Sequence, residues 1–309
     1  MIISPRARAT AEAGRWPAAV VGLAALVVAG SALAASAADL YYERTLMAAV
    51  DTRCRLFEPA IGAALKSAAA QARGAALRSG VAQDSLVSVE RRARNRAASA
   101  RCDSPDIATA ATRVRTAFKG YAQLTRMTWP GDIADWRGDR TVTRLGPLWR
   151  LSQASSFGHD RMIFGFGGED TPGALLAAAS FTDGRTPYAA RLVMRDPARA
   201  GQPYLDGRKA ASRGGIPLAD RTPPPQATRA FAAEARSTAS ERLRPAGAKS
   251  AILFRFPMRA ADALDGLDPR EAVAVEFVFA GATGDQVRRA YVEVGDFAAG
   301  RAFLQVGSR

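Results

Sequence analysis

The sequence has few of the side chains that most often carry chemistry. It contains one histidine, two cysteines and one asparagine, and only four of its 43 basic residues are lysine. The common zinc sites need several histidine or cysteine ligands, so this composition argues against them. The G-x-S-x-G turn that presents a hydrolase serine is also missing. The glycine-rich stretch 165–169 is too short for a phosphate-binding loop, so we expect neither a metal ion nor a cofactor.

The single histidine, His159, lies between two serines and an aspartate in the stretch 155–160. A Ser/His/Asp triad gathers its members from separated segments, because nucleophile, base and orienting acid must be aligned in space. Neighbours on one short loop rarely reach that alignment. We therefore interpret the stretch as a turn before a strand, with a catalytic base at His159 as the lesser alternative.

Basic residues outnumber acidic ones, and the formal net charge is +14. An excess of arginine and alanine with almost no lysine or asparagine is typical of the codon bias of a GC-rich bacterial genome, so a solvated basic surface is the first interpretation. The densest group carries no interleaved aromatic residue, and nucleic acid is therefore not the expected partner. An anionic envelope polymer or lipid headgroups stay as the alternative. This group consists of Arg91, Arg92, Arg94, Arg96 and Arg101.

Residues 16–38 are apolar or small and carry no formal charge, and arginines precede them. A basic flank, an apolar centre at 18–30 and an Ala-x-Ala site are the three parts of a secretory signal. The apolar centre is shorter than the roughly 20 residues that span a bilayer, so we predict a signal peptide at 1–37 that is cleaved near Ala37. The alternative is an uncleaved inner-membrane anchor, with the rest of the chain facing the periplasm. Either interpretation predicts export.

The two cysteines, Cys54 and Cys102, are predicted to form a disulfide, because an even pair in an exported protein most simply makes one bridge. The bridge would close a loop of about 50 residues and would stabilise the fold by ~4 kcal/mol on the chain-entropy model. A reactive or metal-binding pair is the alternative, but the spacing matches no redox motif and no histidine lies nearby.

Residues 38–127 are predicted to form an α-helical module, because apolar residues recur there at helical spacing. Pro59 suits a first helical turn, Gly80 suits a helix end, and Asp84 and Ser104 are expected N-caps. Short connections favour an antiparallel bundle. The helical stretches are 40–57, 59–80, 84–93 and 104–124.

Residues 128–309 are predicted to form a β-rich module, because the pattern changes at Trp129-Pro130-Gly131 to short apolar runs separated by turn residues. A Pro/Gly-rich irregular crossing is expected at 196–225, and helices are expected at 226–243 and 260–267. The whole chain is then α+β, its second module a sandwich or an antiparallel sheet with helices. The predicted strands are 141–144, 148–153, 161–166, 175–181, 189–195 and 252–256, followed by a hairpin of 273–279 with 287–294.

An acidic and aromatic patch lies at the junction between the two predicted modules. A sugar-binding or interface patch is one interpretation, because exposed tryptophans stack on ligands. We prefer buried tryptophans with aspartates that cap turns. The patch consists of Trp129, Asp132, Asp135, Trp136 and Asp139.

No motif in the sequence defines an activity. The leading hypothesis is an exported cell-envelope protein that acts by binding or scaffolding, without catalysis. One alternative is a periplasmic hydrolase that uses carboxylates the sequence does not single out. The other is a binder of anionic envelope polymers or lipid headgroups through arginine-rich surface.

Overall fold

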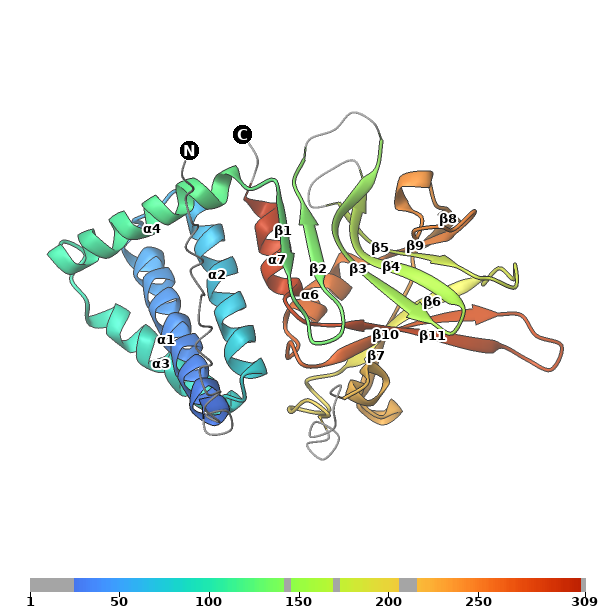
Figure 1. Ribbon diagram of the computed structural model, residues 1–309, viewed down its shortest axis with the longest axis horizontal. Coiled ribbons are helices and arrows are strands. Elements are labelled where there is room, and N and C mark those ends of the chain that lie inside the picture. Colours follow the sequence, from blue (N-terminus) through green and yellow to red (C-terminus); the bar gives the residue numbers. More distant parts are fainter. Residues whose placement is uncertain (1–24, 142–145, 169–172, 206–215, 307–309) are drawn as a thin grey trace, which may run out of the picture.

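The computed structural model describes residues 25–141, 146–168, 173–205 and 216–306, with the side chains of its first helix described from residue 37 onward. A helical module and a β-rich module lie side by side along the long axis of the molecule (Figure 1). The fold is α+β, as the sequence predicts. No helix in these ranges is long and apolar enough to cross a membrane. The first part of the predicted export segment lies outside the described residues.

Four helices form the first module, and the signals that bound them are local. The second helix begins at Pro59, and Gly80, at φ +93°, forms the turn that ends it. The N–H of Val81 there donates to the carbonyl of Ala76, which satisfies a helix-end acceptor. Ser104 caps the fourth helix by accepting a hydrogen bond from the N–H of Ile107 at 3.3 Å. The helices are α1 (Ala25–Cys54), α2 (Pro59–Arg78), α3 (Gln83–Ser99) and α4 (Pro105–Gln123).

The expected cap at Asp84 is wrong by two residues. Ala82 occupies the N-cap position of α3 and makes no side-chain cap, while Asp84 lies inside the first turn. A carboxylate in that turn still stabilises the helix through the positive end of its dipole.

The predicted disulfide is confirmed. Cys54 ends α1 and Cys102 lies between α3 and α4, with their Cα atoms 5.7 Å apart and their sulfurs bonded. The bridge joins two segments 48 residues apart in the sequence. A disulfide between the two cysteines of the chain indicates an oxidising, exported compartment.

The second module contains two antiparallel sheets. Seven strands follow the order β1-β2-β3-β4-β5-β9-β8, and four follow the order β11-β10-β6-β7. The predicted hairpin is β10 with β11, paired from Ala272↔Glu293 to Phe279↔Gln286. The strands are β1 (Arg126–Trp129), β2 (Trp136–Asp139), β3 (Leu148–Phe157), β4 (Asp160–Gly168), β5 (Ala174–Ser180), β6 (Ala189–Arg195), β7 (Thr228–Ala232), β8 (Ala235–Thr238), β9 (Ile252–Phe256), β10 (Ala272–Phe279) and β11 (Gln286–Glu293).

The predicted helix at 226–243 is wrong, because this stretch holds β7 and β8 between the short 3₁₀ turns η2 (Pro225–Ala227) and η3 (Glu241–Leu243). Its alanines suit a helix, but β7 pairs with β6 and β8 pairs with β9, and this pairing decides the backbone. The predicted strand at 141–144 lies outside the described residues except for Thr141.

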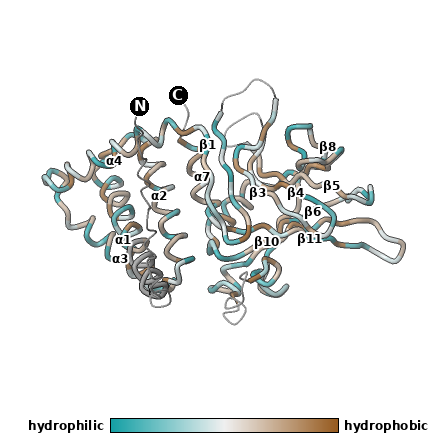
Figure 2. Tube along the Cα trace, viewed as in Figure 1, coloured by the Kyte–Doolittle hydropathy of each residue, from teal (hydrophilic) through white to brown (hydrophobic). Residues whose placement is uncertain are grey.

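The two sheets pack face to face over one core that also takes in α6 (Met258–Asp265) and α7 (Phe297–Gln305). Alternate residues of β10 point into it, and the ring of Phe277 lies 5.7 Å from that of Phe254 on β9 in the facing sheet. Apolar residues gather in the central strands, while the loop tips are more hydrophilic (Figure 2).

Helix α7 lies between the two modules, in contact with α2 on one side and with β2 and β3 on the other (Figure 1). The hydroxyl of Ser67 on α2 donates to the carbonyl of Ala299 at 2.8 Å. Phe303 contacts Tyr121 of α4 and Trp129 of β1 edge-on, at 5.6 and 5.5 Å between ring centroids. The last helix of the chain therefore joins the cores of both modules.

Candidate functional site

The four-stranded sheet has an outer face that carries polar residues. Val273, Val275 and Phe277 of β10 enter the core, so the alternating residues Ala274 and Glu276 face outward. A cleft of about 400 Å³ lies over this face, and we call it the sheet cleft. It is lined by Arg191, Val193, Thr222, Pro223, Pro225, Thr228, Ala230, Ala274, Glu276, Arg289 and Tyr291.

Three charged residues cross the floor of the sheet cleft in a row. Glu276 stands opposite Arg191 of β6 on one side and Arg289 of β11 on the other. The Nε of Arg289 donates to Glu276 Oε1 at 2.7 Å, and the Nε of Arg191 donates to Oε2. Burial alone would raise the pKa of Glu276, but the hydrogen bonds from the two guanidinium groups outweigh it and hold this pKa below its usual value.

Both arginines keep donors available to a ligand. Their side chains are 50% and 55% exposed, whereas that of Glu276 is 7% exposed. Among the described residues, the Nη groups of Arg191 and Arg289 donate to no protein acceptor. Two cations around one carboxylate leave a net positive charge. Guanidinium groups held in place in this way suit the paired oxygens of a carboxylate or phosphate.

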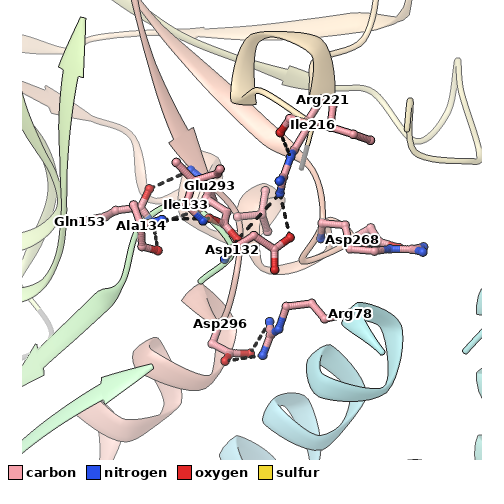
Figure 3. Close-up of polar contacts among 12 residues, drawn as sticks. Arg78, Asp132, Ile133, Ala134, Gln153, Ile216, Arg221, Asp268, Glu293 and Asp296 are labelled. Atoms are coloured by element: carbon pink, nitrogen blue, oxygen red, sulfur yellow. Dashed lines mark hydrogen bonds and ion pairs between the residues drawn. The ribbon is translucent and has the colours of Figure 1, made fainter. Parts of the chain in front are cut away.

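One wall of the sheet cleft is the segment 222–225, and the residue before it is anchored. Arg221, in the short turn η1 (Leu218–Arg221), is buried, and its Nε donates to the carbonyl of Ile216 at 2.7 Å. Its Nη1 donates to Asp132 Oδ2 at 3.0 Å, in the loop between β1 and β2 (Figure 3). The start of the wall is therefore tied to the β1–β2 hairpin, far away in the sequence.

That hairpin loop is in turn organised by Glu293, which is fully buried at the end of β11. Its carboxylate accepts hydrogen bonds from the backbone N–H groups of Asp132, Ile133 and Ala134 at 2.8, 2.8 and 3.1 Å (Figure 3). The Gln153 side chain completes the arrangement by accepting from the N–H of Glu293 at 2.7 Å. A buried carboxylate with this many donors is satisfied, so Glu293 positions the loop.

The predicted junction patch is divided between the core and separate surface contacts. Trp129 and Trp136 are paired across β1 and β2 and are 1% and 0% exposed, so neither ring can stack on a ligand. Asp132 pairs with Arg221, as described above. Asp139 accepts from Arg126 Nε at 2.9 Å on another edge of the hairpin, and Asp135 is exposed.

The five predicted arginines of the basic group are exposed, but they do not act as one face. Arg94 pairs with Glu90 at 2.5 Å, and Arg101 lies beyond the end of α3 and pairs with Asp103 at 2.9 Å. Arg91 donates to the hydroxyl of Ser88. In the described part of the chain, Arg91, Arg92 and Arg96 have no ion pair, so three of the five positive charges in this group are not neutralised.

His159 lies exposed in the turn between β3 and β4. The neighbouring Asp160 is buried and does not orient the imidazole, since it accepts from the N–H of Thr182 and from Arg288, both at 2.9 Å. The hydroxyl of Ser155 donates to the carbonyl of Tyr291 at 2.8 Å. The structure therefore brings these sequence neighbours into separate contacts.

Two carboxylates border a small cavity between α2 and the C-terminal helices. Asp265 and Asp296 line its volume of about 150 Å³, and burial raises the pKa of both, although Arg301 and Arg78 oppose the shift. Small-molecule sites are usually about 300 Å³ or larger, so this cavity suits water or a small ion better than a polymer. No group of three or more metal-ligating side chains occurs among the described residues.

Sequence reasoning missed the sheet cleft because its charged row is assembled from three strands. Arg191 and Glu276 are 85 residues apart, and the link between β6 and β10 has no local signal. The β10–β11 hairpin did contain a local signal. Glu276 is the charged residue of an otherwise apolar strand, and the predicted pairing of 273–279 with 287–294 places an arginine near it.

Comparison with known proteins adds no relative. No family model matches this chain, and no curated protein or solved structure is significantly similar to it.

Proposed function

We propose that this chain is an exported, non-enzymatic binding protein whose sheet cleft holds an anionic segment of an envelope polymer. The observation that carries the proposal is the row Arg191–Glu276–Arg289, in which one buried carboxylate orients two guanidinium groups whose Nη donors stay open. The cleft volume of about 400 Å³ lies within the range of about 300–1,000 Å³ that is typical of ligand sites.

The ligand class follows from the mixture of groups around the row. Tyr291 offers a ring face and a hydroxyl, and Thr228 lies near the wall, while the floor is otherwise small and apolar. Rings and hydroxyls suit a sugar, and the two arginines suit its carboxylate. We therefore propose an acidic saccharide as the ligand, in preference to a lipid headgroup on the α3 arginines.

The hydrolase alternative has less support. Its best candidate pair, Asp265 and Asp296, is held in ion pairs with Arg301 and Arg78 beside a cavity of about 150 Å³. A retaining or inverting glycosidase needs two carboxyl groups on either side of a bound sugar, which this volume does not provide.

We place the protein in the periplasm or outside the cell, with inner-membrane anchorage as the alternative. Helix α1 runs unbroken from Ala25 to Cys54, and Ala37 and Ala38 pack against the helical core near Tyr41. Cleavage near Ala37 would remove the part of this helix before Ala38 and leave the packing of Ala38 and Tyr41 in the helical core intact. N-terminal sequencing of the fractionated protein decides: a start near Ala38 supports release, and an intact terminus in the membrane supports anchorage.

The binding proposal is tested by isothermal titration of oligogalacturonate, an acidic saccharide, into the full chain at low and moderate salt. We expect saturable binding that weakens with salt, and loss of about tenfold to a hundredfold in affinity for Arg191→Gln or Arg289→Gln, because each removes charge-assisted hydrogen bonds.

Arg259→Gln is the matched control, since Arg259 is exposed on α6, outside the sheet cleft, and the variant loses the same charge. It should bind like the wild type. Equal losses in all three variants would show non-specific attraction, and binding of neutral oligosaccharides with equal affinity would refute an anion site.

A further inference from the structure

A second concave surface lies on the helical module, on the opposite side of α7 from the sheets. It is a groove of about 420 Å³ between α2 and α4, and we call it the helix groove. Ile61, Leu65, Val114 and Phe118 give it an apolar floor, and Tyr121 closes it near β1. Of these residues, Val114, Phe118 and Tyr121 belong to α4 and are only half-buried. Ile107 and Ala111, which lie nearer the start of the same helix, are buried.

Two arginines border this apolar floor. Arg44 of α1 is half-buried and donates from Nη1 to the carbonyl of Ala68 at 2.7 Å, and Arg113 of α4 is exposed. Neither makes a salt bridge with a carboxylate among the described residues. Burial lowers the pKa of Arg44, although the negative charge of the neighbouring Glu43 acts in the opposite direction. The helix groove thus combines an apolar floor with unpaired positive charge at its edge.

We propose that the helix groove binds a single-chain anionic amphiphile, a fatty acid, with its chain along α2 and α4 and its carboxylate at the edge that Arg44 and Arg113 form. Charge complementarity carries this choice, because an apolar chain covers the floor and one negative head compensates the arginines. The volume of about 420 Å³ is that of a small-molecule site. This site is separate from the sheet cleft and does not depend on its function.

The test uses cis-parinaric acid, a fluorescent fatty acid, titrated into the delipidated full chain and displaced by alkanoates of increasing length. We expect saturable binding, with affinity rising about tenfold for two added methylenes until the helix groove is filled. Dodecanol should compete at least tenfold less well than dodecanoate, since it lacks the charge.

Two pairs of variants separate the groove from the rest of the surface. Ala117→Trp fills the helix groove and should weaken binding at least tenfold, whereas Ala108→Trp, at an exposed position of α4 outside the groove, should not. Arg113→Gln should weaken the binding of dodecanoate but leave the binding of dodecanol unchanged. Lys119→Gln, which lies on α4 outside the groove, should change neither affinity.

Several results would overturn the proposal. These are equal affinity for the alcohol and the acid, equal losses in both tryptophan variants, or no saturable binding at all. Concentration-dependent dimerisation that Ala117→Trp abolishes, without fatty-acid binding, would assign the helix groove to a second copy of the chain. Arg191→Gln should leave parinarate binding unchanged, so failure of the sheet-cleft proposal is read separately.

Discussion

At the scale of single residues, arginine does more in this molecule than coat its surface. Arg195 is buried in a two-bond pair with Glu271, both bonds 2.7 Å long, and Arg221 is buried between Ile216 and Asp132. The sequence interpretation of a solvated basic surface therefore applies to α3 but not to these positions. Guanidinium groups suit such places because their planar donors satisfy several acceptors at once.

The charged row of the sheet cleft should respond to acid through Glu276. Because its folded-state pKa lies below the usual value of 4.5, the ionised carboxylate stabilises the fold above that pH, and this stabilisation is lost as the pH falls through the lowered pKa. Urea unfolding from pH 7 to pH 3 should therefore show a gap between the wild type and Glu276→Gln that closes at the acid end. A gap that is constant with pH would contradict the ion-pair assignment.

At the scale of elements, local signals predicted the helices well and the strands in part. Pro59, Gly80 and Ser104 act within one helical turn, so their effects can be read directly from sequence. The stretch 226–243 was misread because its strands are fixed by partners in two different sheets. Helix α7 was not predicted at all, since it is only nine residues long and its stability comes from packing between the modules.

The disulfide makes a prediction at this scale. It joins the end of α1 to the turn before α4 and closes a long loop, so the double variant Cys54→Ser/Cys102→Ser should lose ~4 kcal/mol of unfolding free energy in guanidinium titrations. The fully reduced wild type should behave in the same way. A loss below about 1 kcal/mol would show that helix packing alone holds the module together.

At the scale of the whole molecule, α7 makes one unit of two modules. Arg78 of α2 pairs with Asp296 before α7 at 2.9 Å (Figure 3). Gly74 of α2 lies beside that carboxylate. The boundary predicted at 127/128 falls inside β1, which continues directly from α4. None of this long-range pairing has a local signature, which is also why the sheet cleft could not be located from the sequence.

This joint predicts a single unfolding transition. Helix content followed by circular dichroism and the fluorescence of the core tryptophans should change together on heating.

The contact between α2 and the start of α7 can be tested with two glycine variants. Gly74→Ala would place a Cβ 2.7 Å from Asp296 Oδ1 and should lower the free energy of unfolding by about 1–3 kcal/mol. Gly120→Ala on α4 meets nothing within 4 Å and should be neutral or slightly stabilising. Equal behaviour of the two variants would refute the role given to the α2–α7 contact.

The central claim is that the sheet cleft binds an anion through Arg191 and Arg289. The most direct measurement follows the arginine Nε–H signals by nuclear magnetic resonance while oligogalacturonate is added, with Arg191→Gln, Arg289→Gln and Arg259→Gln used for assignment. Binding in the sheet cleft should give saturable shifts of the Arg191 and Arg289 signals with one dissociation constant, while the Arg259 signal stays in place. Shifts confined to Arg92 and Arg96 on α3, or no shifts at saturating ligand, would contradict it.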